Sequence, residues 1–192
     1  MKFILASASP RRAQLLTEAG YDFDIIPADV DEKQVPLVSP SEVAQRLAIL
    51  KAETVSAIHA DDVTLAADTV VCLGERILGK PQDANEAREM LELLSGTTQI
   101  VITGFCVMRP AGQFMHSGRA MTAVRMDRLT RGQIDQYVAS NQWQGKAGGY
   151  GIQDNDPFVK RISGSHSNVV GLPMEMITQA LSRAGIEPKS KA

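Results

Sequence analysis

The sequence is poor in the residues that build disulfides and soft-metal sites. Its 192 residues include two cysteines and three histidines, and no Cys-x-x-Cys pair occurs. His59, His116 and His166 are far apart in the chain, which disfavours a zinc site. Cys72 and Cys106 each lie in an apolar run, so we expect buried free thiols rather than a disulfide. A hard-cation site built from carboxylates is not excluded by this composition.

Long apolar runs and a strong excess of either charge are also absent. No stretch approaches the roughly 18 apolar residues that a transmembrane helix needs. The formal net charge is −2 at pH 7, so we expect neither nucleic acid nor a membrane surface as a partner. The N-terminal segment lacks the pattern of a signal peptide, and we therefore expect a cytoplasmic location.

The order of apolar and capping segments predicts an α/β fold with a mixed sheet. Strand-like and helical segments alternate early in the chain, and an antiparallel hairpin follows in the middle. We expect one domain over residues 1–186, followed by a frayed tail at 187–192. Strands are expected at 2–6, 23–27, 63–67, 70–73, 76–78, 99–108, 114–126 and 158–162. Helices are expected to start at Pro10, at Pro40 (running to about His59), after Asp83, after Thr130 and at Pro173, and a polar loop is expected at 164–168.

The first twelve residues predict a strand, a polar turn and a helix N-terminus. Ser9 is the expected N-cap, and Pro10 suits the first helical position. Arg11 and Arg12 fall in the first turn, where positive charge opposes the helix dipole. An anion bound there would relieve this conflict, so the segment is a candidate phosphate site. The alternative is an ordinary capped helix whose two arginines face water.

Asp68 stands out because it interrupts two apolar, strand-like runs together with Thr69. A buried carboxylate without a partner is costly, so Asp68 needs a cation, a metal or several donors. The alternative is an aspartate at a strand end that caps a turn. Lys51 lies in a predicted helix and Lys80 follows a predicted strand. The glycine-rich stretch that ends at Gln153 lets backbone approach a ligand closely, and the amide of Gln153 is suited to reading a base edge.

The chain resembles the Maf family of nucleoside triphosphate pyrophosphatases over nearly its whole length. The resemblance rests on short motifs in a fixed order. They are Ser7-Ala8-Ser9-Pro10-Arg11-Arg12, Val30-Asp31-Glu32, Ala67-Asp68-Thr69, Gly79-Lys80-Pro81, Leu94-Ser95-Gly96, Lys146 to Gln153 and Val170-Gly171-Leu172-Pro173. It implies an inosine-triphosphatase-like fold, with two lobes around a substrate cleft. It also implies hydrolysis of the α–β phosphoanhydride to a nucleoside monophosphate and pyrophosphate, with a divalent cation, Mg²⁺ or Mn²⁺.

The resemblance assigns roles to individual residues. Asp68 matches the presumed catalytic acceptor of a proton from the attacking water. Glu32 matches an acidic metal-binding position, and either Glu32 or Asp68 is able to hold the metal or activate the water. Phosphate contacts are implied for Ser7, Arg12, Lys51 and Lys80.

The resemblance also implies a substrate preference. Arg11, Thr69 and Gln153 match the branch that prefers dTTP and UTP, whereas the 7-methyl-GTP branch has Trp, Gln and Glu at these positions. The expected substrates are therefore dTTP, UTP and modified pyrimidine analogues. The chain departs from the family at Gln99, where histidine is usual, and at Asp154, where glycine is usual.

Two other functions compete with this prediction. One is a non-catalytic nucleotide-binding regulator of cell division and septum formation, a process to which the family has been linked. The other is a phosphatase that releases orthophosphate. A homodimer is compatible with the family resemblance.

Overall fold

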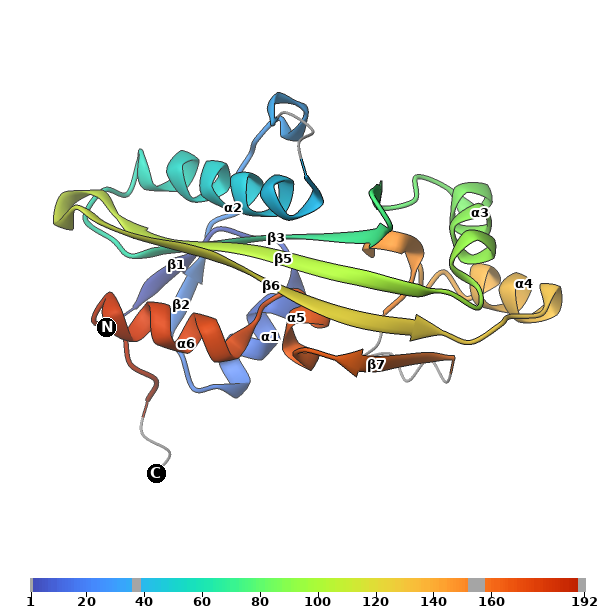
Figure 1. Cartoon of the computed structure of the whole chain (residues 1–192). Coiled ribbons are helices and arrows are strands. Elements are labelled where there is room, and N and C mark those ends of the chain that lie inside the picture. The colour runs from blue at the N-terminus through green and yellow to red at the C-terminus, as the bar shows by residue number, and fades with distance from the viewer. Residues whose placement is uncertain (1, 36–38, 152–157, 190–192) are drawn as a thin grey trace.

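A computed structural model describes residues 2–35, 39–151 and 158–189, and its strands form one mixed sheet (Figure 1). The strand order is β2-β1-β3-β5-β6-β7, and β4 pairs with β3. β1 is parallel to β2 and β3, and the other pairs are antiparallel. The strands are β1 (Phe3–Leu5), β2 (Phe23–Ile25), β3 (Thr64–Leu73), β4 (Arg76–Leu78), β5 (Thr98–Arg109), β6 (Phe114–Met126) and β7 (Val159–Ser163).

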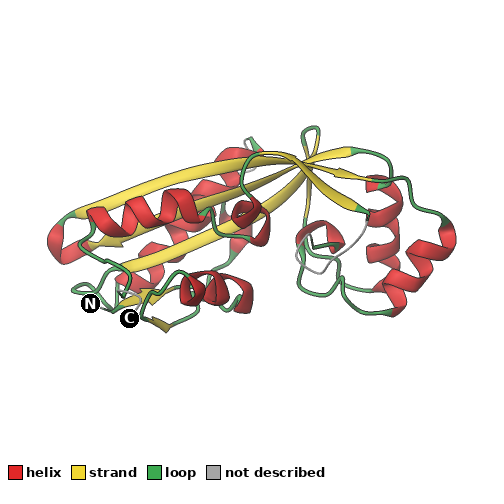
Figure 2. Cartoon of the chain, turned by 90° about the horizontal axis from the view of Figure 1, so that it is seen from below, coloured by secondary structure: helices red, strands yellow, loops and turns green. Residues whose placement is uncertain are grey.

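Helices cover both faces of this sheet. α2 packs along one face of β3 and β5, and α1, α5 and α6 lie on the opposite face (Figure 1). α3 and α4 lie at the far end of the long strands and form a second lobe (Figure 2). The α-helices are α1 (Pro10–Glu18), α2 (Pro40–Ser56), α3 (Ala84–Leu94), α4 (Arg131–Ala139), α5 (His166–Val170) and α6 (Met174–Arg183). The predicted α/β fold, with a mixed sheet, flanking helices and two lobes, is confirmed.

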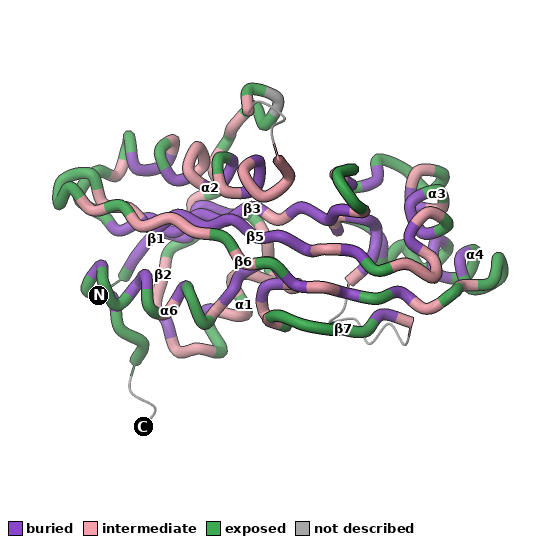
Figure 3. The backbone as a smooth tube through the Cα atoms, viewed as in Figure 1, coloured by how far each residue is buried: buried purple, intermediate pink, exposed green. Residues whose placement is uncertain are grey.

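Alternate residues of β3 enter different apolar layers, as the period of a strand requires. Ala66 packs with Cys106 and with α2, whereas Leu65 and Ala67 pack with the α1 and α6 side. The strands β3 and β5 are mostly buried, and β7 is mostly exposed (Figure 3). The same alternation sends neighbouring residues of β3 to opposite faces of the sheet.

Gly104 of β5 lets α2 approach the sheet closely. A Cβ atom at this position would lie 2.3 Å from the backbone oxygen of Ala44, so no larger residue fits without a shift. Gly104 pairs with Asp68 across the β3–β5 ladder. The missing side chain therefore brings α2 against the sheet at the level of Asp68.

Several predicted helix caps are present. Ser39 and Glu42 form a reciprocal capping box at the start of α2, and Thr130 does the same for α4 with Gln133. Asp83 caps α3, although the carboxylate of Glu86 accepts from Gln82 N rather than from Asp83. Ser9 precedes α1 as expected, but its side chain makes no capping hydrogen bond.

Two predictions about local structure are wrong. Asp68 and Thr69 do not interrupt a strand, because β3 runs continuously through them. Asp68 is therefore a mid-strand residue whose carboxylate is paired from outside the strand. The expected polar loop at 164–168 contains the start of α5, with Ser165 as N-cap and Gly171, at a φ of 118°, as C-cap. Glycine, serine and histidine in this segment suggested a loop, but Ser165 binds Asn168 N and nucleates a short helix.

The C-terminal segment contacts the body of the protein as far as it is described. Lys189 N donates to Gly20 O at 2.8 Å, and its side chain pairs with Asp22. Residues 190–192 lie outside the described part, so the division at residue 186 stays a prediction. Within the described residues, no helix is long and apolar enough to cross a membrane.

Candidate active-site cleft

A cleft of about 1200 Å³ opens at an unpaired stretch of the β3 edge. β1 pairs with β3 only as far as Leu65, and β4 joins the same edge from Val71 onward. Between these points, no described strand pairs with that edge of β3. The cleft brings together nearly all of the predicted site residues. They are Ser7, Arg11, Arg12, Glu32, Lys51, Asp68, Thr69 and Lys80.

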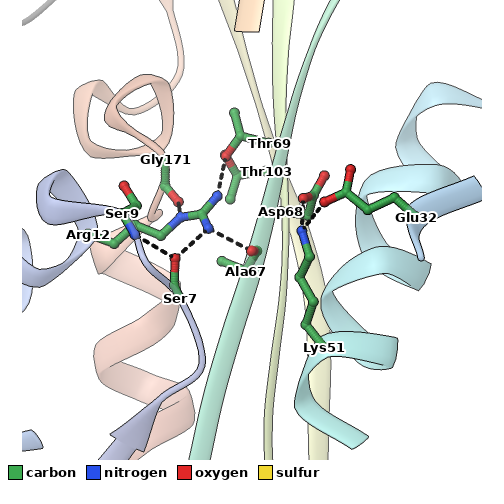
Figure 4. Close-up of polar contacts among 10 residues, drawn as sticks. All are labelled: Ser7, Ser9, Arg12, Glu32, Lys51, Ala67, Asp68, Thr69, Thr103 and Gly171. Atoms are coloured by element: carbon green, nitrogen blue, oxygen red, sulfur yellow. Dashed lines mark hydrogen bonds and ion pairs between the residues drawn. The ribbon is translucent and has the colours of Figure 1, made fainter. Parts of the chain in front are cut away.

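Arg12 closes part of the open edge from the α1 side (Figure 4). Ile4 N and Ala6 N donate to Val63 O and Leu65 O, and Arg12 Nη1 donates to the next acceptor in this series, Ala67 O, at 2.8 Å. The guanidinium thus takes the place that a further strand amide would fill.

The other donors of Arg12 bind three separate elements. Nη1 also donates to Ser7 Oγ at 3.0 Å, Nε donates to Gly171 O at 2.8 Å, and Nη2 donates to Thr69 Oγ1 at 3.1 Å. Burial lowers the pKa of Arg12, and the charge of Asp68 opposes this shift. Arg12 is therefore a rigid cation, held between α1, β3 and the end of α5.

Lys51, Glu32 and Asp68 form an ion-pair cluster on the α2 side of β3 (Figure 4). Lys51 Nζ lies 2.6 Å from Asp68 Oδ1 and 2.7 Å from Glu32 Oε1. The side chains of Lys51 and Asp68 are 14% and 13% exposed, and that of Glu32 is 54% exposed. The partner that Asp68 requires as a buried carboxylate is thus the ammonium group of Lys51.

The surroundings of Glu32 in this cluster favour its ionised form. Burial alone would raise the pKa of Glu32, but the hydrogen bond and the charge of Lys51 outweigh it, and the pKa is lowered. Lys80 and Arg12 act in the same direction over a longer range. Glu32 is therefore negatively charged at neutral pH.

The carboxylates suit a divalent cation only as a partial ligand set. The described residues contain no group of three or more His, Cys, Asp or Glu side chains that would hold a metal by themselves. Glu32 and Asp68 meet at one ammonium group, and such a pair of hard oxygen donors fits Mg²⁺ when substrate phosphates and water complete the shell. The expected metal-binding residues are therefore chemically appropriate.

The remaining predicted residues differ in how far the structure defines them. Arg11 Nη2 donates to Gly145 O at 3.2 Å across the cleft, and burial lowers its pKa. Lys80 lines the cleft and has no ion pair among the described residues. Gln153 and Asp154 lie outside the described residues, so the predicted role of Gln153 stays a prediction.

Lys146 is a cleft residue that the sequence analysis did not single out. It lies in the glycine-rich stretch, is 8% exposed and lines the cleft wall. Its place within a glycine-rich motif was the feature of the sequence that could have identified it as a cleft residue. The departure at Gln99 lies away from the cleft, where Gln99 Nε2 donates to Leu94 O and Thr97 Oγ1. Gln99 thus stabilises the turn that follows α3.

Comparisons with known proteins show what the whole chain is similar to. A "dTTP/UTP pyrophosphatase" of Chelativorans sp. is 43% identical over 97% of this chain and 92% of its own length. The protein of the same name from Hyphomonas neptunium is 49% identical over 89% of both chains. A solved HAM1 protein from Coxiella burnetii aligns with 95% of this chain and 99% of that chain, at a TM-score of 0.52 and 18% identity, which shows a shared fold.

A family model decides the membership. The model described as "Maf-like protein" matches residues 2–184, which is almost the entire chain. The chain therefore belongs to the Maf family.

Proposed function

We propose that this protein hydrolyses the α–β phosphoanhydride of nucleoside triphosphates, releasing a nucleoside monophosphate and pyrophosphate. The observation that carries the proposal is the Asp68–Lys51–Glu32 cluster, which faces a cleft that is also lined by the cations Arg11, Arg12, Lys80 and Lys146. A carboxylate beside several fixed cations suits water activation next to a polyphosphate. The name shared by the relatives, dTTP/UTP pyrophosphatase, supports the same reaction.

Asp68 is the general base in this proposal. Its Oδ1 accepts from Lys51 Nζ, whereas within the described part of the chain no donor is hydrogen-bonded to Oδ2. Oδ2 is thus available to accept a proton from an attacking water molecule. Lys51 holds the carboxylate in one orientation through a contact of 2.6 Å.

The cations bind and neutralise the triphosphate. Arg11, Arg12, Lys51 and Lys80 line one cleft and carry charge of one sign. Charge that develops on the departing pyrophosphate would be stabilised by these fixed groups. Ser7 holds Arg12 through its hydroxyl and lies at the same wall.

Glu32 and Asp68 would hold a divalent cation together with the phosphates. When bound, Mg²⁺ or Mn²⁺ supplies Lewis-acid stabilisation of phosphoryl oxygens. We propose dTTP and UTP as substrates, with modified pyrimidine nucleotides, because Arg11, Thr69 and Gln153 match the family branch with this preference. The names of the relatives point to the same nucleotides.

A product-resolved substrate panel tests the proposal. The purified protein is incubated with each common NTP and dNTP, ITP and 7-methyl-GTP, with Mg²⁺ or Mn²⁺, and pyrophosphate, orthophosphate and monophosphate are quantified. Asp68→Asn removes the base at constant size. Asp61→Asn is the matched control, because Asp61 is exposed and does not line the cleft.

The expected result is pyrophosphate from dTTP and UTP, lost in Asp68→Asn and retained in Asp61→Asn. Orthophosphate as the product would indicate a phosphatase instead. Tight nucleotide binding without turnover would favour the regulator that the sequence left open. Turnover of 7-methyl-GTP alone would keep the reaction and reject the substrate assignment.

A further inference from the structure

A line of hydroxyl groups lies behind the cationic wall of the cleft, on the α5 side of the sheet. Thr103 of β5 is fully buried and pairs with Thr69 of β3 across the ladder. The two threonine side chains lie side by side (Figure 4), with their Oγ1 atoms 2.9 Å apart. Thr103 Oγ1 also lies 3.0 Å from Asn168 O. Thr69 Oγ1 in turn accepts from Arg12 Nη2.

The chemistry of these groups determines where each hydroxyl proton lies. Asn168 O is a backbone carbonyl and can only accept, so Thr103 donates its single hydroxyl proton to it. Thr103 then has none left for Thr69, and Thr69 must be the donor in the contact between the two threonines. Thr69 Oγ1 therefore presents only lone pairs to Arg12.

We propose that Thr103 is a positioning residue that orients Arg12 for anion binding through Thr69. Arginine has five N–H donors, and four of those of Arg12 are bound, to Gly171 O, Ser7 Oγ, Ala67 O and Thr69 Oγ1. Nε has one hydrogen and Nη1 has two, and all three are used. Nη2 has two hydrogens, and Thr69 Oγ1 accepts one of them. The other is the donor that remains for an anion, and the position of Thr69 determines which of the two hydrogens this is.

The end of α5 holds both sides of this arrangement. Asn168 O receives Thr103, and Gly171 O receives Arg12 Nε at 2.8 Å. Asn168 is itself fixed, because its Nδ2 donates to Val101 O at 3.1 Å and to Thr122 Oγ1 at 2.9 Å. The proton of Thr103 thus has one stable direction, toward α5.

Loss of the Thr103 hydroxyl would release the proton of Thr69. The O–H of Thr69 would then have no acceptor at Thr103, and the Thr69 side chain would lose the contact that fixes its Oγ1 as the acceptor of Arg12 Nη2. One of the four anchors of the guanidinium would no longer be held in place, and the direction of its free donor would no longer be fixed. The effect on anion binding should equal that of one hydrogen bond to a charged group, about tenfold in affinity.

The test uses inorganic tripolyphosphate as the probe, so that it does not depend on turnover. Its dissociation constant is measured by calorimetry for the wild type, Thr103→Val, Thr103→Ser, Thr69→Val and the double valine variant. Thr103→Val removes the hydroxyl at nearly constant volume, and Thr103→Ser keeps it. Thermal unfolding of each variant is measured in parallel, and kcat and KM for dTTP are measured as a second readout.

We expect Thr103→Val to weaken tripolyphosphate binding about tenfold and Thr103→Ser to restore it. In the Thr69→Val background, Thr103→Val should have no further effect, because it acts through Thr69. A lowered melting temperature with unchanged tripolyphosphate affinity, or additive losses in the double variant, would overturn the proposal.

The kinetic readout rests on the proposed function, whereas the binding readout does not. If the wild type fails to hydrolyse dTTP, the proposed function fails, and the tripolyphosphate comparison still decides the role of Thr103. If the wild type hydrolyses dTTP and Thr103→Val binds tripolyphosphate normally, only the role of Thr103 is rejected.

Discussion

Replacing Lys51 by methionine should increase the affinity of the nucleotide-free protein for Mn²⁺. In the free protein, the ammonium group of Lys51 lies 2.7 Å from Glu32 Oε1 and 2.6 Å from Asp68 Oδ1, the two carboxylates that would hold a divalent cation. Lys51 and a metal therefore compete for the same carboxylates. A triphosphate would favour the metal, because it adds oxygen ligands to those of the two carboxylates.

The magnitude follows from the charges that Lys51 leaves behind. Two unit charges 4 Å apart interact by about 4 kcal/mol at an effective dielectric constant of 20. The 54% exposure of Glu32 screens its share of this energy. We therefore expect a net gain of about 1.4 kcal/mol or more in Mn²⁺ binding, which is about tenfold in the dissociation constant.

Two measurements check this prediction. The first is the Mn²⁺ dissociation constant without nucleotide, from calorimetry or from the EPR signal of free Mn²⁺. The second is thermal unfolding in EDTA, where Lys51→Met should be less stable because Asp68 has lost its partner. Mn²⁺ at about 100 times its dissociation constant should then recover about 2.7 kcal/mol.

Lys80→Met is the matched control. It removes the same charge from the same cleft, but Lys80 forms no ion pair among the described residues. An unchanged or weaker Mn²⁺ affinity in Lys51→Met would refute the competition between Lys51 and the metal. An equal gain in Lys51→Met and Lys80→Met would mean that removing any positive charge from the cleft strengthens Mn²⁺ binding.

Three further predictions concern the framework around the cleft. Gly104→Ala should lower the free energy of unfolding by about 3 kcal/mol, measured by urea titration, because its Cβ would meet Ala44 O. Native Cys72 and Cys106 should resist iodoacetamide at pH 8 and react once unfolded, because burial raises their pKa to about 11 and about 12. Glu32→Gln should lower the melting temperature at pH 7, and this difference should shrink as the pH falls below the ordinary range of a glutamate. The pKa of Glu32 is lowered on folding, so its stabilisation is present above the unfolded pKa and is lost as pH falls through the folded one.

Each of these three predictions has a result that would contradict it. An unchanged urea midpoint for Gly104→Ala would mean that α2 shifts without cost. Rapid alkylation of the native protein would mean that the thiols open locally. A stability difference for Glu32→Gln that persists in acid would mean that its charge is not what stabilises the cleft.

Local features of the fold could be predicted from the sequence because neighbouring residues carry them. The capping boxes at Ser39 and Thr130 close within one helical turn, and the structure contains both. The strand at 114–126 matches β6, because the turn and the apolar pattern both lie nearby in the chain. α5 was missed because five residues are too few to show helical periodicity.

In the site, too, the residue types could be predicted from the sequence, whereas their partners could not. The sequence identified Asp68 as a buried carboxylate in need of a partner but could not name that partner, which lies 17 residues away on α2. It placed Arg12 in the first turn of a helix as a phosphate ligand, but most of its donors bind backbone and hydroxyl groups, including Gly171, which is 159 residues away. Such pairs follow from the packing of α2 and α5 on opposite faces of β3.

By itself, the sequence determined the α/β class, the helix caps, the buried thiols and the identity of the polar residues available for chemistry. Those properties depend on local spacing and on burial preference, which can be read along the chain. Only the tertiary structure decided that Asp68 and Thr69 face opposite sides of one strand, each with its own cation. Successive side chains of a strand alternate between its faces, and the gap between β1 and β4 leaves the edge of β3 open, so that Arg12 reaches it from the α1 side.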